Sequence, residues 1–105
     1  MVKRARQSKP ELAFELLWNQ RLKERDDVIA ASFGLEREWQ FARHLKRKFR
    51  FDFAHIASHV AVEIQGGIYT RGAHVRPAGY RNDCEKSLIA RELMWSTVML
   101  TPDMI

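Results

Sequence analysis

Residues 49–65 read FRFDFAHIASHVAVEIQ and contain two apolar segments, each with the two-residue alternation typical of a half-buried β-strand. In the first segment, the aromatic residues Phe49, Phe51 and Phe53 fall on one face. The polar residues Arg50 and Asp52 fall on the other. In the second segment, the β-branched residues Val60, Val62 and Ile64 fall on one face. Ala61, Glu63 and Gln65 fall on the other. A short turn around Ala57-Ser58 would make the two segments neighbouring strands of one sheet.

Asp52 and Glu63 are the chemically informative residues of this strand pair. Burying a carboxylate in so apolar a segment is costly unless it is paired or bound to a metal. The turn would bring the two carboxylates together, and a divalent cation would offset their repulsion. Because Mg²⁺ prefers carboxylate and carbonyl oxygens, we expect Asp52 and Glu63 to be direct metal ligands and the backbone carbonyl of Ile64 to be a further one. Gln65 shares the face of Glu63 and could orient water or a phosphate oxygen.

Length and composition indicate one globular domain. The chain has 105 residues, of which 46% are hydrophobic and 30% charged, as in ordinary soluble domains. We expect residues 1–7 to form a disordered basic tail and residues 8–105 to form a single domain. No apolar run approaches the ~18 residues that a membrane-spanning helix needs, which argues against a membrane partner. The only cysteine, Cys84, cannot form an internal disulfide, which fits a reducing, cytoplasmic compartment.

The charge balance predicts an anionic partner. Eighteen Lys and Arg residues against thirteen Asp and Glu give a formal net charge of +5. The positive residues gather in residues 43–50 and again after the second strand segment, and such groups suit phosphate contacts. The expected DNA-binding residues are Arg43, Lys46, Arg47, Lys48, Arg50, Arg71, Arg76 and Arg81. An ordinary solvated turn is the alternative for the first group. His74, near the second group, either contacts phosphate, carries a proton, or has no role.

The rest of the chain predicts a helix before these strands, and a helix and a strand after them. Ser8 and Glu11 form a capping box around Pro10, so a helix is expected from there to about residue 26. Its predicted apolar face is Leu12, Ala13, Leu16, Leu17 and Gln20. A second helix is expected from residue 80 or 81 to residue 93, with an apolar stripe of Cys84, Leu88, Ile89 and Leu93. Strands are expected at 37–42, 49–55, 59–65 and 95–100, and a long glycine-rich loop at 66–79.

This arrangement resembles the PD-(D/E)XK nuclease superfamily. The core of the resemblance is an Asp and a Glu-x-Gln on consecutive strands, here Asp52 and Glu63-Ile64-Gln65. A longer string of motifs is similar to small phage-encoded members that are related to very-short-patch repair endonucleases and to phage junction-resolving enzymes. Those motifs are Phe51-Asp52-Phe53-Ala54, residues 62–67, His74, Gly79-Tyr80, Asp83-Cys84-Glu85-Lys86 and Thr101-Pro102. The resemblance covers about residues 35–105.

The resemblance implies an α/β fold with a restriction-endonuclease-like mixed sheet of about four strands, in the order αβββαβ. It implies a DNA endonuclease that uses Mg²⁺, with Mn²⁺ able to substitute, acting in the host cytoplasm if the protein is phage-encoded. Asp52 and Glu63 match the metal-binding acids of the superfamily. Gln65 stands where the superfamily usually has a lysine, and Lys86 on the second helix is the candidate for the missing positive charge.

Some assignments stay open at this point. Members of the superfamily often carry a glutamate on the first helix that faces the site, and Glu11 and Glu15 are both candidates. Glu11 could instead serve only the capping box, Lys86 could pair with Asp83 on the same helix, and the two strand acids could face solvent. One functional alternative is a structure-selective junction resolvase or nicking enzyme, which would act as a homodimer because two strands must be cut. Another is a catalytically inactive DNA-binding module of the same fold.

Overall fold

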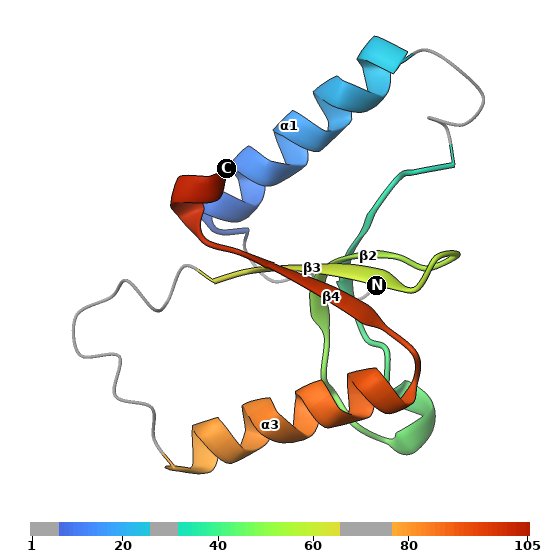
Figure 1. Ribbon diagram of the computed structural model, residues 1–105, viewed down its shortest axis with the longest axis vertical. Helices are drawn as coiled ribbons and strands as arrows, with labels where there is room; N and C mark the ends of the chain where they lie inside the picture. Colours follow the sequence, from blue (N-terminus) through green and yellow to red (C-terminus); the bar gives the residue numbers. More distant parts are fainter. Residues whose placement is uncertain (1–6, 26–31, 66–76) are drawn as a thin grey trace.

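The computed structural model describes residues 7–25, 32–65 and 77–105, and these form a mixed α/β fold. The elements follow the predicted order of helix, three strands, helix and strand (Figure 1). They are α1 (Lys9–Arg25), β1 (Glu36–Trp39), the 3-10 helix η1 (Arg43–Leu45), β2 (Phe51–His55), β3 (Val60–Ile64), α3 (Pro77–Glu92), β4 (Ser96–Leu100) and the 3-10 helix η3 (Pro102–Met104).

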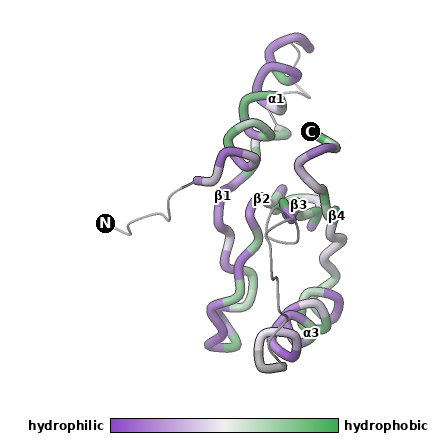
Figure 2. The backbone as a smooth tube through the Cα atoms, turned by 90° about the vertical axis from the view of Figure 1, so that its left-hand side faces the viewer, coloured by the Kyte–Doolittle hydropathy of each residue, from purple (hydrophilic) through white to green (hydrophobic). Residues whose placement is uncertain are grey.

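One four-stranded sheet organises these elements, with strand order β1-β2-β3-β4. β1 pairs antiparallel with β2, β2 pairs antiparallel with β3, and β3 pairs parallel with β4. The parallel pair is possible because α3 carries the chain from the end of β3 back to the start of β4. Figures 1 and 2 show α1 and α3 on opposite sides of the strands. The sheet is therefore mixed, as expected from the sequence.

The connection between β2 and β3 is the short turn predicted around Ala57-Ser58. His59 closes it with a positive φ of 55° and donates its N–H to the carbonyl of Ile56 at 3.1 Å. The ladder that follows runs inward through three pairs and ends at Phe53 and Val62. Asp52 and Glu63 come directly after this last pair, one on each strand. The two carboxylates therefore sit where β2 and β3 stop pairing.

α1 begins as predicted but packs through a different face. Ser8 accepts the N–H of Glu11 at 3.3 Å, which caps the first turn. The buried residue of the helix is Phe14, whose ring lies 5.0 Å from that of Phe53 on β2. The predicted apolar face was wrong, because Leu12, Ala13, Leu16, Leu17 and Gln20 are exposed, Leu16 to 61%. The larger aromatic side chain decides which face meets the sheet, since it removes more apolar surface from water.

α3 begins earlier than predicted and also turns a different stripe toward the sheet. It starts at Pro77, inside the expected loop, because proline has a helix-compatible φ and lacks the N–H that a first turn leaves unbonded. The predicted stripe was partly wrong: Cys84 is exposed and Leu88 is 60% exposed. Ala90 is buried instead, and Ile89 and Leu93 pack against the core.

The main core lies between the sheet and α3 and is aromatic. Phe51 is 1% exposed, and its ring centroid lies 4.0 Å from that of Phe41 and 5.0 Å from that of Trp95. Phe53 packs instead against Phe14 on the α1 side, so the prediction that Phe51 and Phe53 share one face was wrong. Side chains of β2 alternate strictly between the two faces only where β2 is paired with β3. That pairing ends at Phe53, so Phe51 lies beyond it and can face the other side.

Because α1 packs through Phe14 and not through Leu16, shortening these two side chains should lower the free energy of unfolding by different amounts. Phe14→Ala should lower the free energy of unfolding by about 3–5 kcal/mol, because it removes a buried ring and leaves a cavity. The matched control is Leu16→Ala, at an exposed position of the same helix, which should cost less than about 1 kcal/mol. Urea denaturation followed by circular dichroism measures both. Equal losses would contradict the packing described above.

Candidate functional site

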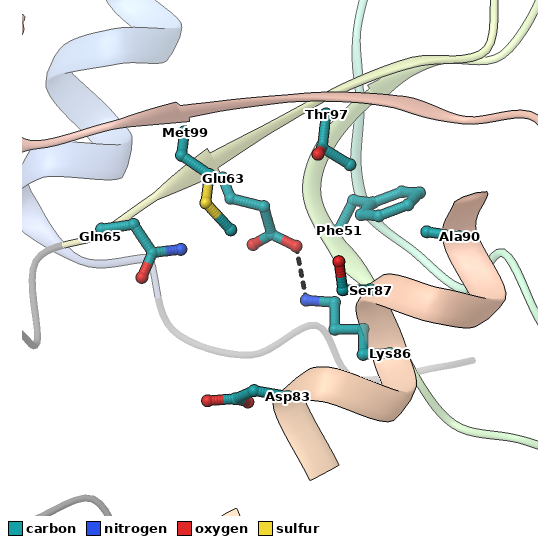
Figure 3. Close-up of a pocket in the computed structure, with 9 residues that line it drawn as sticks. All are labelled: Phe51, Glu63, Gln65, Asp83, Lys86, Ser87, Ala90, Thr97 and Met99. Atoms are coloured by element: carbon teal, nitrogen blue, oxygen red, sulfur yellow. Dashed lines mark hydrogen bonds and ion pairs between the residues drawn. The ribbon is translucent and has the colours of Figure 1, made fainter. Parts of the chain in front are cut away.

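A pocket of about 150 Å³ lies between the sheet and α3 and holds three of the four side chains predicted to be catalytic (Figure 3). Glu63 and Gln65 enter it from β3 and the residue after it, and Lys86 enters it from α3. The full lining is Phe51, Glu63, Gln65, Asp83, Lys86, Ser87, Ala90, Thr97 and Met99. Acidic, amide and ammonium groups thus share one small space with an apolar wall.

Lys86 and Glu63 form an ion pair inside this pocket. The ammonium Nζ lies 2.5 Å from Oε1 of Glu63, and Figure 3 shows the lysine reaching from α3 toward the strand. Glu63 is only 7% exposed. The same ammonium lies 5.7 Å from the ring centroid of Phe51, a cation–π distance. Lys86 therefore faces the sheet, and the ion pair that it makes is with Glu63 rather than with Asp83 on its own helix.

Asp52 approaches the same site from β2. Its Oδ2 accepts the backbone N–H of Ile64 at 2.7 Å, so the carboxylate takes the place of a ladder acceptor where the strands part. The next N–H along β3, that of Gln65, donates to the carbonyl of Leu100 on β4 at 2.7 Å. In a trans peptide the C=O and the following N–H point in opposite directions, so the carbonyl of Ile64 points toward β2. That carbonyl and Asp52 thus lie on the same side of β3.

The two carboxylates influence each other electrostatically. Burial raises the pKa of Glu63 above its ordinary value, and Asp52 raises it further through its charge and a side-chain hydrogen bond. The hydrogen bond and the charge of Lys86 act in the opposite direction without cancelling the rise in pKa. Asp52 and Glu63 are therefore neighbours in space.

The structure also separates the two helix glutamates that the sequence left open. Glu11 is half-buried, and burial raises its pKa, with the charges of Asp52 and Glu38 adding to the rise. Glu15 instead accepts a hydrogen bond from Gln7 at 3.3 Å and lies 3.7 Å from Nε of Arg37. The charge of Asp52 acts on the carboxyl of Glu11, which also accepts a hydrogen bond from the capping Ser8 at 2.9 Å.

The donor groups fit Mg²⁺ better than a metal that demands a full set of protein ligands. In residues 7–25, 32–65 and 77–105, no group of three or more His, Cys, Asp or Glu side chains could hold a metal. Two carboxylates and one backbone carbonyl leave room for several waters, and Mg²⁺ usually keeps several waters in protein sites. A divalent cation held by these groups would offset the burial and the repulsion that raise the pKa of Glu63.

The predicted DNA-binding residues that the structure describes lie between β1 and β2 and on α3. Arg43, Lys46, Lys48, Arg50 and Arg81 are exposed, and Arg47 is half-buried. Arg47 pairs with Glu85 of α3 and also lies 4.5 Å from the ring centroid of Phe49. Arg50 pairs with Glu38 at 3.3 Å. The basic segment therefore contacts the helix that carries Lys86. Arg71, His74 and Arg76 lie outside the described residues.

Some pocket residues were not singled out from the sequence. Asp83 and Ser87 could have been found, because with Lys86 and Ala90 they have the spacing of one helix face. Thr97 and Met99 could not. They reach the pocket because β4 pairs in parallel with β3, with Met99 opposite Glu63, and no sequence pattern fixes that register.

Comparison with protein families, with curated proteins and with solved structures finds no match for this chain. Among the described residues, no helix combines the length and the apolar character that crossing a membrane requires.

The raised pKa of Glu63 makes stability depend on pH. Below the unfolded pKa the carboxyl is protonated in both states, and stability is lost as pH rises through the higher folded pKa. Gln mimics the protonated form, so Glu63→Gln should gain stability relative to the wild type from about pH 4.5 upward, by roughly 1.4 kcal/mol for each unit of pKa elevation. Urea denaturation between pH 4 and about 7.5 without divalent metal measures this.

The control is Glu36→Gln, which removes the same charge from an exposed position in β1. Identical pH dependence in the two variants would contradict the raised pKa of Glu63.

Proposed function

We propose that this chain is a Mg²⁺-dependent DNA endonuclease that hydrolyses phosphodiester bonds, with a restriction-endonuclease-like version of the mixed sheet and membership of the PD-(D/E)XK superfamily. The observation that carries the proposal is the meeting of Asp52, Glu63 and Lys86 at the point where β2 and β3 stop pairing. Two adjacent acids suit a hard divalent cation. A lysine on the same spot suits a reaction that develops negative charge.

Each residue has a role that follows from its contacts. Asp52, Glu63 and the carbonyl of Ile64 would hold Mg²⁺ (or Mn²⁺), which when bound supplies an activated water and stabilises the leaving oxygen. Lys86 lowers the pKa of Glu63 through its hydrogen bond and charge, and it presents an ammonium group in the pocket. Gln65 lines the same pocket, where its amide can donate a hydrogen bond to water or to a phosphate oxygen.

The position of Lys86 is relevant to Gln65, which stands where the superfamily usually has a lysine. A glutamine in place of the usual superfamily lysine favours the alternative of an inactive DNA-binding module, because an amide carries no charge. Lys86 can supply the missing positive charge, because its ammonium group reaches Glu63 from the neighbouring helix α3. Exposed cations on the segment before β2, such as Lys46 and Lys48, would hold the DNA phosphates by charge.

Cleavage should require both strand acids. In Mg²⁺ or Mn²⁺, the wild type should cut at least one member of a panel of linear, supercoiled, nicked, mismatched and four-way DNA. Asp52→Asn and Glu63→Gln should each lower the rate by roughly a hundredfold or more, since each removes a proposed metal ligand. Gel electrophoresis measures cleavage, and fluorescence anisotropy in EDTA measures DNA binding, which both variants should retain.

Glu36→Gln serves again as the charge-matched control and should cleave like the wild type. If the wild type binds DNA but cuts nothing on the panel, the protein is a binding module. If it neither binds nor cuts, the proposal fails altogether. Preferential cutting of four-way or nicked DNA, with a dimer in sedimentation, would select the resolvase or nicking activity.

Lys86 should matter for turnover. Lys86→Ala should lower kcat by roughly a hundredfold, the usual size of a lost charge-stabilising donor, with a smaller change in KM. Lys23→Ala, which removes a lysine from an exposed position of α1, is the matched control. An unchanged kcat for Lys86→Ala would reduce Lys86 to a structural partner of Glu63 and would leave Gln65 as the remaining candidate.

A further inference from the structure

The pocket continues into a second hollow that the proposed chemistry does not use. This hollow, of about 270 Å³, is lined by Ser87, Ala90, Arg91, Trp95, Ser96 and Thr97. Three of these residues, Ser87, Ala90 and Thr97, also line the pocket around Glu63 and Lys86. Figure 3 shows these three between α3 and the strands. The two hollows therefore lie next to each other along α3 and β4, and together they are called the α3–β4 groove below.

The distal end of the α3–β4 groove has the chemistry of an anion site. Three hydroxyl-bearing residues line it: Ser87 and Thr97, which also line the pocket around Lys86, and Ser96. No described residue makes a hydrogen bond to any of these three hydroxyls, and none forms an ion pair with Arg91, which is exposed in the last turn of α3. No acidic side chain is among the residues that line this end. Hydroxyl donors and a guanidinium together are the groups that contact phosphate oxygens.

The length of the groove suits a phosphodiester chain. Arg91 follows Lys86 by five residues on one helix, which is about 7.5 Å along the helix axis. This distance is comparable to the separation of neighbouring phosphates along one DNA strand, so the two side chains can reach phosphates that lie close together in the strand. β4 is the last strand in the sheet order, so no described strand lies beyond it on that side.

We propose that the α3–β4 groove binds the backbone of the DNA strand that is cut, with Arg91 holding a phosphate that neighbours the scissile one. This inference rests on the proposed nuclease function and deepens it, because it assigns a phosphate subsite outside the metal-binding acids. Arg91 makes a two-pronged contact with the phosphate, and the hydroxyl of Thr97 donates to the same group. The subsite sets the position of the DNA relative to Glu63 and Lys86, and it carries no base specificity.

The first test compares two arginines of equal charge. Fluorescence anisotropy of a labelled cleavable DNA is measured in EDTA over a range of salt. Arg91→Ala should weaken binding roughly tenfold and should reduce the slope of log K against log salt by about 1. Arg21→Ala removes an exposed arginine from α1, on the other side of the sheet, and should have a clearly smaller effect. Arg91→Lys should restore part of the affinity, because it restores the charge without the two-pronged geometry.

The second test locates the phosphate. Single methylphosphonate substitutions, which are uncharged, are placed one at a time along the cut strand. The wild type should lose affinity at one phosphate that neighbours the cut, and Arg91→Ala should be insensitive to substitution at that phosphate only. Additive effects of Arg91→Ala and every methylphosphonate would overturn the subsite, as would equal losses for Arg91→Ala and Arg21→Ala.

These outcomes are separate from those that test the nuclease itself. A wild-type protein that cuts DNA, with Arg91→Ala behaving like Arg21→Ala, removes the α3–β4 groove and leaves the nuclease function standing. A wild-type protein that neither binds nor cuts DNA removes both.

Discussion

The hydrogen bond from the N–H of Ile64 to the carboxylate of Asp52 is the contact on which the site depends. The β2–β3 ladder ends at Phe53 and Val62, and a backbone N–H just beyond the last pair needs an acceptor. Asp52 supplies that acceptor from its side chain. The strands can therefore separate without leaving a backbone donor unbonded, and the carboxylate is held beside Glu63. The same hydrogen bond thus satisfies the backbone N–H of Ile64 and fixes the position of the Asp52 carboxylate.

The acids create an electrostatic cost that the rest of the fold offsets. Glu63 is buried beside a second carboxylate, which raises its pKa. Lys86 reduces the cost, and it reaches Glu63 because the aromatic core around Phe51 and Trp95 packs α3 against the sheet. α3 also pairs with the basic segment through Arg47 and Glu85. One helix therefore joins the lysine of the site, the cations before β2 and the α3–β4 groove, so a change in its packing would alter all three.

Predictions from the sequence succeeded where a local pattern has a local cause. The strand pair, its short turn and the cap at Ser8 follow from residues within a few positions of one another, and the structure contains all three. The helix faces were less predictable. The spacing of leucines predicted that the side of α1 with Leu16 would be buried. Phe14 packs against the sheet instead, because Phe53 of β2 lies there. On α3, Leu88 is exposed for a comparable reason, since the small Ala90 allows closer packing against Phe51 and Trp95.

The sequence by itself determined that Asp52 and Glu63 would lie together, because a short turn between two alternating strands leaves little freedom in their relative placement. Only the tertiary structure decided which cation meets them. Lys86 follows Glu63 by 23 residues, and its approach depends on how α3 docks across the sheet. The electrostatic influence of Asp52 on Glu11 depends in the same way on the docking of α1. The α3–β4 groove is a further example, since it arises from the parallel register of β3 and β4. Contacts between distant segments are set by the packing of whole faces, which no short-range periodicity records.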